Sequence, residues 1–186
     1  MTKWKSFTYG GIVYDLSHLD PSTEYYIQPS FGGKPEQKYK VHVGYSHHCF
    51  TNGDNLQKQC DPSLLIRDSK QSGTCNGDPR PFDVDRYKLS FYLPSIVKNI
   101  HIKKTFHTGK GNFFLVELVD SNGVGVEYEV YFKVYKASSR GWLDMIVQSA
   151  YTRTKNPSGR TKKGKPINIF ALFNNVLKGK VPREPI

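Results

Sequence analysis

The strongest constraint on the fold is a series of four strand-like runs within residues 101–153. Each run is rich in aromatic and β-branched residues: HIKKTF, KGNFFLVELVD, GVEYEVYFKVYKAS and GWLDMIVQSAYTR. The segments HTGKG, DSNG and SSRG between them combine glycine with small polar residues, which is typical of turns. Consecutive strands joined by short turns pair as neighbours. The runs therefore predict a four-stranded antiparallel meander.

Three further strands are expected before residue 52. FTYGGIVYDLS predicts a first strand with a bulge or sharp bend at its two glycines. EYYIQPS (24–30) predicts a second strand and KYKVHVGYSHHCFT (38–51) a third. Apolar and polar residues alternate in the third strand, with Tyr39, Val41 and Val43 on one side and Lys40 and His42 on the other. Because FGGKPEQ is a turn, the second and third strands are expected to pair.

Helical segments flank the meander. PFDVDRYKLSFYLPSIVKNI (81–100) offers Asp83 or Asp85 as the cap of a helix and has a broad apolar stripe. Pro94 is expected to kink or divide this helix. INIFALFNNVLKGK (167–180) predicts a short amphipathic helix. The element order predicts an α+β fold, in which a helix and a four-stranded meander follow an N-terminal β-hairpin region and precede a C-terminal helix. The 186 residues are expected to form a single domain, 1–186.

Residues 52–81 are expected to form a long surface loop or insertion. Asn, Asp, Gly, Ser, Gln and Pro dominate there, with one apolar island at residues 64–66. A loop of this length is either a lid over the sheet or an insertion, and the low apolar content favours an insertion.

The three cysteines, Cys49, Cys60 and Cys75, have no CxxC spacing and are interpreted as free thiols of a cytoplasmic protein. A zinc site that uses the neighbouring His47 and His48 is the alternative. Because the separations match none of the familiar finger or ribbon patterns, the sequence predicts no metal and no cofactor.

An excess of positive charge indicates the class of partner. The chain has 27 Lys and Arg residues against 16 Asp and Glu, a formal net charge of +11. This balance favours a polyanionic partner, although it also serves solubility alone. No apolar run is long enough to span a bilayer, and no signal-peptide core follows MTKWKSF. Nucleic acid is therefore expected rather than a membrane, and the cytoplasm is the expected location.

The sharpest local charge signal is the connection 153–166. It contains Arg153, Lys155, Arg160, Lys162, Lys163 and Lys165 and no acidic residue. Such a cluster is expected to follow a phosphate backbone, although a solvated loop has the same composition. The 12 Tyr and 11 Phe residues offer stacking surfaces for single-stranded bases, and RNA is favoured over DNA.

A small polar site is expected on the meander. Ser149 and Tyr151 lie two apart on the fourth strand and so point to one face, while Lys104, His107 and Lys110 lie on or beside the first turn. Cleavage of RNA without a metal needs a base, an acid and cations around the phosphorane. His107 has the right intrinsic pKa, and lysines beside it would lower that pKa and hold the phosphate. Ser149 and Tyr151 would contact phosphate oxygens, or Tyr151 would stack on a base.

This arrangement resembles the barnase, EndoU, colicin and RelE (BECR) superfamily of RNases. The similarity covers about residues 82–153: a helix, then a meander with a His and a Lys near its first strand and a Ser and a Tyr near its last, IVQSAYTR. The resemblance implies a metal-independent endoribonuclease of toxin or defence type. It implies that His107 is the general acid or base, that Lys110 or Lys104 contacts the phosphate, and that Ser149 and Tyr151 hold the last-strand positions.

The sequence also departs from the BECR pattern. Many members use a second His or a Glu, a role for which only His101, Glu117 or Glu127 is at hand. The first two strands and the long loop are additional to the pattern.

Three functions stay open at this point. The first is the endoribonuclease, the second a non-catalytic RNA- or DNA-binding module, and the third a regulatory domain whose basic face binds an acidic inhibitor or partner protein. Each candidate residue also has a plainer explanation. His107 fits a solvated turn, Ser149 the solvated face of a sheet, and Tyr151 cross-strand packing.

Overall fold

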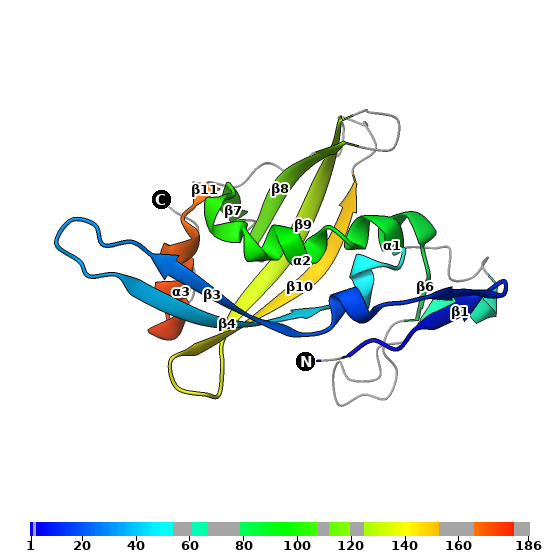
Figure 1. Cartoon of the computed structure of the whole chain (residues 1–186), viewed down its shortest axis with the longest axis horizontal. Helices are drawn as coiled ribbons and strands as arrows, with labels where there is room; N and C mark the ends of the chain where they lie inside the picture. The colour runs from blue at the N-terminus through cyan, green and yellow to red at the C-terminus, as the bar shows by residue number, and fades with distance from the viewer. Residues whose placement is uncertain are drawn as a thin grey trace.

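The protein is a seven-stranded mixed sheet with helices packed against one of its faces (Figure 1). This computed structural model describes residues 1, 3–53, 61–66, 79–107, 112–119, 125–152 and 166–180. In sheet order the strands are β11 (Pro166–Ile167), β7 (Thr105–His107), β8 (Asn112–Val119), β9 (Gly125–Lys136), β10 (Trp142–Thr152), β4 (Gln37–Tyr45) and β3 (Ser22–Gln28). The helices are α1 (Val84–Ser90), α2 (Leu93–Lys98) and α3 (Ile169–Leu177). The α+β prediction is confirmed.

The predicted meander is present as β7, β8, β9 and β10, each antiparallel to the next. Its first strand is shorter than predicted, because residues Ile100–Ile102 form a 3-10 turn (η5) before β7 begins. The predicted pairing of the second and third strands is also confirmed, as β3 and β4. The sequence did not indicate how the two groups join. β10 runs parallel to β4, with Leu143 paired to Val41.

The predicted first strand is a separate hairpin. β1 (Phe7–Tyr9) and β2 (Ile12–Tyr14) pair with each other around Gly10 and Gly11, outside the large sheet. Both glycines have positive φ, 57° and 76°, which is the requirement of the tight two-residue hairpin turn. The expected bend at the glycines is therefore a complete reversal of the chain.

The helical segment before the meander is divided, as Pro94 predicts. Asp83 caps α1, because its carboxylate accepts hydrogen bonds from the backbone N–H groups of Asp85 and Arg86. The chain turns after Ser90 and begins again as α2. Pro94 is the second residue of α2, where a missing N–H costs no intrahelical hydrogen bond.

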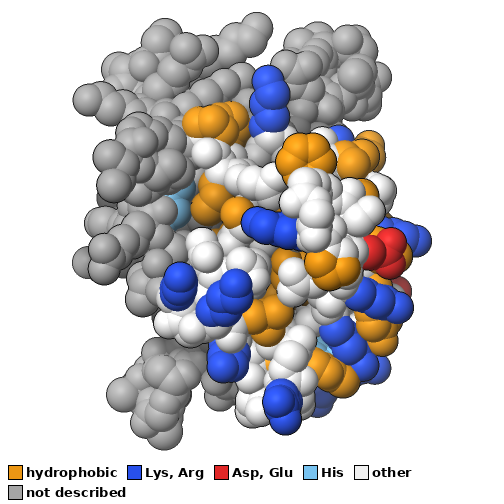
Figure 2. All heavy atoms as spheres, turned by 90° about the vertical axis from the view of Figure 1, so that its left-hand side faces the viewer, with side chains coloured by type: hydrophobic (Ala, Val, Ile, Leu, Met, Phe, Trp, Pro, Cys, Tyr) orange, Lys and Arg blue, Asp and Glu red, His pale blue; other side chains and the backbone are white. Residues whose placement is uncertain are grey.

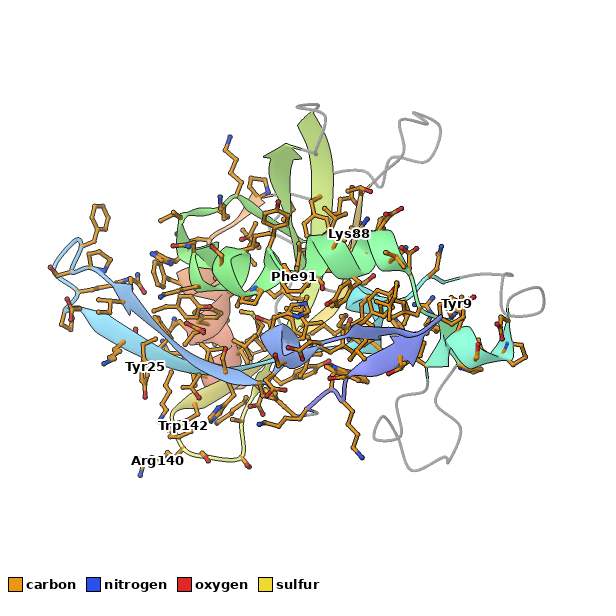
Figure 3. The ribbon with its side chains drawn as sticks, turned by 45° about the vertical axis from the view of Figure 1, so that its right-hand side comes forward. Tyr9, Tyr25, Lys88, Phe91, Arg140 and Trp142 are labelled. Atoms are coloured by element: carbon orange, nitrogen blue, oxygen red, sulfur yellow. The ribbon has the colours of Figure 1, made fainter. Side chains whose placement is uncertain are left out.

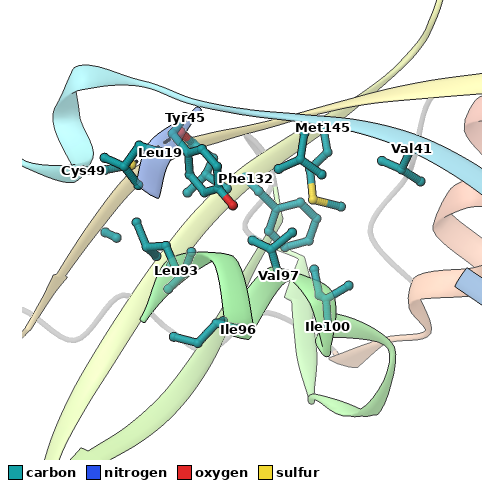
Figure 4. Packing of buried hydrophobic residues seen from close by; sticks show 14 of the residues in the cluster. Leu19, Val41, Tyr45, Cys49, Leu93, Ile96, Val97, Ile100, Phe132 and Met145 are labelled. Carbon is teal, nitrogen blue, oxygen red and sulfur yellow. Dashed lines mark hydrogen bonds between the residues drawn. The ribbon is translucent and has the colours of Figure 1, made fainter. Parts of the chain in front are cut away.

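One hydrophobic core lies between the sheet and the helices. Leu93, Ile96 and Val97 of α2 belong to one buried cluster with Phe132 of β9 and Met145 of β10, and Val97 lies beside Phe132 (Figure 4). Leu93, Phe132 and Met145 are each at most 1% exposed, and complete burial of such a side chain contributes about 1.5–3 kcal/mol to stability. In β10 the odd residues Leu143, Met145 and Val147 are buried, whereas their even neighbours are half-exposed. The sheet therefore has one covered face and one face turned away from the helices.

The described part of residues 52–81 contains short ordered elements. The apolar island forms a 3-10 turn, η4 (Pro62–Leu64), and a strand, β5 (Leu65–Ile66), which pairs with β6 (Arg80–Pro81). Leu64 and Ile66 pack against the core. Residues 54–60 and 67–78 lie outside the described ranges. Within those ranges, no helix is both long and apolar enough to cross a bilayer.

Candidate nucleic-acid interface

His107 lies on the covered face of the sheet. It is the last residue of β7, and the strand register aligns it through Asn112 of β8 with Phe132 of β9. Directly opposed residues point to the same face, and Phe132 is a core residue. His107 is only 6% exposed. The explanation of His107 as a solvated turn residue is therefore wrong.

Ser149 and Tyr151 lie on the opposite face. A bulge in β10 after Val147 brings Ser149 opposite Tyr131 and Tyr151 opposite Glu129. These partners alternate with the buried Val130 and so point away from it. The structure thus confirms that Ser149 and Tyr151 share a face, but it places His107 on the other side of the sheet.

Tyr151 is held in a chain of hydrogen bonds. Its hydroxyl donates to the Tyr131 hydroxyl at 3.3 Å, and the Tyr131 hydroxyl donates to a Glu129 carboxylate oxygen at 2.6 Å. The rings of Tyr131 and Tyr151 stack with centroids 5.6 Å apart. The cross-strand packing expected as the plainer role of Tyr151 is present.

Most of the predicted basic residues lie outside the described ranges. These are Lys110, Arg153, Lys155, Arg160, Lys162, Lys163 and Lys165. Lys104 is described and is exposed just before β7. It lines a pocket together with residues of α3, away from Ser149 and Tyr151.

The sheet face turned away from the helices carries a set of aromatic and basic side chains, here called the open face. It consists of Thr23, Tyr25 and Ile27 of β3, Lys38, Lys40 and His42 of β4, Trp142, Asp144 and Ile146 of β10, and Lys133 and Tyr135 of β9. Tyr25, Ile27 and Tyr135 are 52%, 50% and 46% exposed. Tyr25, Trp142 and Arg140 of the β9–β10 turn lie on this side, opposite Lys88 and Phe91 on the helical side (Figure 3).

The strand register arranges this face in rows. One row is Tyr25, Lys40 and Trp142, because Lys40 is opposite Tyr25 in the antiparallel pair and opposite Trp142 in the parallel pair. The next row is Thr23, His42, Asp144 and Tyr135. Strands in a sheet are about 4.8 Å apart, so residues of a row that lie on neighbouring strands are within contact distance of each other.

Lys40 is the centre of the first row. Its Nζ lies 3.4 Å from the centroid of the Trp142 ring and 5.6 Å from that of Tyr25. Lys38 Nζ lies 4.6 Å from the Tyr25 centroid. These are cation–π distances, which hold the two ammonium groups beside the rings.

His42 joins the two rows. Its ring centroid is 4.6 Å from that of Trp142, and its Nδ1 shares a 3.0 Å hydrogen bond with the Thr23 hydroxyl. Both contacts fix the imidazole on the open face. The side chains at the centre of the open face are therefore already held in place by contacts with one another. A ligand that binds there would lose less free energy to the ordering of side chains.

The charge of the open face is positive. Lys38, Lys40 and Lys133 share this side of the sheet with the carboxylates of Asp144 and Glu129, and Glu129 is buried and accepts a hydrogen bond from Tyr131. The neighbouring surface of the β3–β4 hairpin and α3 also carries many more basic than acidic side chains (Figure 2). Aromatic rings that stack bases and lysines that neutralise phosphates are the two components of single-stranded nucleic-acid sites. Among the described residues there is no group of three or more His, Cys, Asp or Glu arranged to hold a metal ion.

The sequence predicted some residues of the open face and missed others. The alternation in β4 placed Lys40 and His42 on the polar side, as the structure confirms. Trp142 and Tyr25 were missed as partners of Lys40. The only available signal was that each is an aromatic residue on the non-core side of its own strand, and this signal does not say which strands are neighbours.

Sequence comparison places the whole arrangement within one family. The profile of the YjaZ family matches residues 6–177. The chain belongs to the YjaZ family. It is also 30% identical over 189 aligned residues to "Protein YjaZ" of Escherichia coli (strain K12), an alignment that covers 98% of this chain and 96% of that protein.

The YjaZ family match extends over β1 to α3 and so includes all four strands of the open face. No solved structure matches the chain. The resemblance to the BECR RNases therefore stays a prediction, as does the endoribonuclease activity that it implies.

Proposed function

We propose that the protein binds single-stranded nucleic acid, RNA in the first place, on the open face, and that it does so in the cytoplasm. The observation that carries this proposal is the placement of Lys40 between Tyr25 and Trp142 on an uncovered sheet face. The two aromatic rings can each stack on a base, and the ammonium group between them can contact the phosphate that joins the two nucleotides.

The contact between Lys40 and Trp142 has a role in this proposal. In the free chain the ammonium group lies over the indole ring. A base that stacks on the ring displaces the ammonium group, which then reaches the phosphate of the same nucleotide. Stacking on an aromatic side chain contributes about 1–3 kcal/mol per base, and this energy is nearly independent of base identity. Binding with little sequence preference follows.

The geometry favours binding without cleavage over the endoribonuclease. His107 lies on the covered face, whereas Ser149 and Tyr151 lie on the other. An acid–base pair must reach the same phosphate, and one on each side of a sheet cannot. Cleavage is nevertheless tested by the experiment below, because Lys110 and the segment 153–165 lie outside the described ranges.

The test is fluorescence anisotropy with labelled 15-nucleotide single-stranded RNA and DNA at several KCl concentrations. We expect Tyr25→Leu and Trp142→Leu each to weaken binding by roughly 5- to 150-fold, the range that corresponds to one lost stacking contact. Tyr25→Phe is expected to retain binding, because the ring remains. The matched controls are Tyr92→Leu and Lys88→Met, which remove an exposed ring and an exposed charge on the helical side.

The same samples separate the alternatives. If neither RNA nor DNA is retained at modest ionic strength, the proposal is wrong and an acidic protein partner becomes the better hypothesis. Equal weakening by the helical-side controls would also contradict the open face as the site. RNA that shortens in the presence of EDTA, and stays intact with His107→Ala, would support the endoribonuclease.

A further inference from the structure

A pocket with several cationic lining residues lies at the other edge of the sheet. It has a volume of about 310 Å³ and is formed where η5 and β7 meet β11 and the start of α3. These elements come together beside α3 in Figure 1. The lining residues are His101, Lys103, Lys104, Thr105, Pro166, Ile167, Asn168, Ile169 and Phe170. None of them is acidic.

The donors around this pocket all suit an anion. Lys103 and Lys104 bring two ammonium groups from consecutive positions, and His101 adds an imidazole. Asn168 stands at the N-terminus of α3, where its side-chain oxygen accepts from the N–H groups of Phe170 and Ala171. Its amide NH₂ therefore remains a donor, and the aligned dipoles of the nine-residue helix add partial positive charge.

A buried hydroxyl group gives an independent indication of a ligand. Thr105 lines the pocket, is 1% exposed, and its Oγ1 has no hydrogen-bond partner in the described structure. A buried hydroxyl without a partner is destabilising, so such groups are rare unless something outside the chain completes them. After a rotation of the Thr105 side chain that turns the hydroxyl toward the pocket, a tetrahedral oxyanion there would accept its hydrogen bond together with those of the cationic donors.

We propose that this pocket binds a phosphate group. The group has two chemically equivalent sources: free phosphate or a small phosphorylated molecule, and the terminal phosphate of a nucleic-acid chain. The proposal does not depend on the open face, because no residue is shared between the two surfaces.

The first experiment uses inorganic phosphate as the probe, with potassium chloride at equal ionic strength as the reference. Isothermal titration calorimetry and thermal unfolding are expected to show binding and an increase in Tm for the wild-type chain. Thr105→Val is expected to weaken phosphate binding by about 10-fold or more, because a hydrogen bond to a charged oxygen is lost. Without phosphate this variant is expected to be at least as stable as wild type, since it removes an unpartnered hydroxyl group.

Matched variants distinguish a phosphate contact from a structural role. Thr105→Ser keeps the hydroxyl and is expected to retain binding. Lys103→Met and Lys104→Met are expected to weaken it, while Lys98→Met, an exposed lysine of α2 outside the pocket, is expected to have no effect. The proposal is overturned if phosphate does not affect the wild-type chain, or if Thr105→Val and Lys104→Met bind phosphate as well as wild type does.

The second experiment identifies the source. Oligonucleotides with a 5′-phosphate and with a 5′-hydroxyl are compared in the anisotropy assay. A preference for the 5′-phosphate that Thr105→Val abolishes and Tyr25→Leu leaves intact assigns the pocket to the chain end. Equal binding of the two oligonucleotides, with inorganic phosphate binding intact, assigns it to a free phosphate or a small phosphorylated molecule.

Discussion

Lys40 and Trp142 are paired across neighbouring parallel strands, and the Lys40 ammonium group lies 3.4 Å from the centroid of the indole ring. The two residues are far apart in the sequence. They meet because β10, the last strand of the meander, adds to the edge of the β3–β4 hairpin. This single pairing converts two separate half-polar strands into one continuous basic and aromatic surface.

The lysines of this surface predict a change in salt dependence. In Lys38→Met/Lys40→Met, the slope of log K against log [KCl] for single-stranded RNA is expected to fall by about 0.7 for each lysine that contacts a phosphate. Anisotropy titrations at four salt concentrations give the slope. Lys88→Met provides the control for an exposed lysine on α1. An unchanged slope in the double variant would mean that these ammonium groups do not contact phosphates.

The same Tyr→Phe substitution is expected to affect stability strongly at Tyr26 and hardly at all at Tyr25. The buried Tyr26 hydroxyl donates to the Val97 carbonyl at 2.8 Å and so ties β3 to α2. Tyr26→Phe is expected to lower the free energy of unfolding by about 1–2 kcal/mol, because a buried hydrogen bond is lost. Tyr25→Phe, one residue away on the exposed side, is expected to change it by less than about 0.5 kcal/mol. Urea unfolding monitored by circular dichroism measures both; equal effects would contradict the assignment of faces.

His18 predicts a pH dependence of stability. Its Nε2 donates to Ser90 Oγ at 2.7 Å, since the Ser90 hydroxyl itself donates to the Tyr87 carbonyl, and its ring stacks on Phe91. Burial lowers the pKa of His18 below its ordinary 6.5, and the Asp15 backbone and carboxylate oppose this only in part. The unfolded chain therefore takes up the proton first. The stabilisation is complete above the unfolded pKa and is lost as the pH falls from there through the folded pKa.

The check compares wild type with His18→Gln, which does not titrate. The difference in Tm between the two is expected to be constant above about pH 7 and to shrink below pH 6.5, the ordinary His pKa. A difference that stays constant down to pH 5 would show that the His18 pKa is not lowered by folding.

The Cys49 thiol is expected to be unreactive in the folded chain. It is fully buried, its Sγ donates to the Val147 carbonyl at 3.6 Å, and burial raises its pKa to about 12. The thiolate is the reactive form, so Cys49 is expected to react with a disulfide reagent at pH 8 only as fast as the chain unfolds. The Cys60→Ser/Cys75→Ser variant leaves Cys49 as the sole thiol for this measurement. Complete reaction of the native chain within seconds would contradict the prediction.

The local elements could be predicted because their causes are local. The alternation of polar and apolar residues placed Lys40 and His42 on the other side of β4 from Val41. Pro94 predicted the division of the helix, and Asp83 was one of two candidate helix caps. Each of these features depends on backbone geometry or hydrogen bonds within a few residues. The chemistry attached to His107 was harder, because a residue beside a turn signal is exposed or buried according to what packs on it. His107 is buried because it lies on the sheet face that the helices cover.

The sequence by itself determined the strand and helix segments, the pairing of chain neighbours, and the excess of positive charge. The tertiary structure alone decided that β10 lies parallel to β4, and with it the contact of Trp142 with Lys40 and the separation of His107 from Ser149 and Tyr151. The physical reason is that pairing between chain neighbours is set by short turns. Pairing between distant strands is set by which apolar faces can be buried together, a property of the whole core that no single segment encodes.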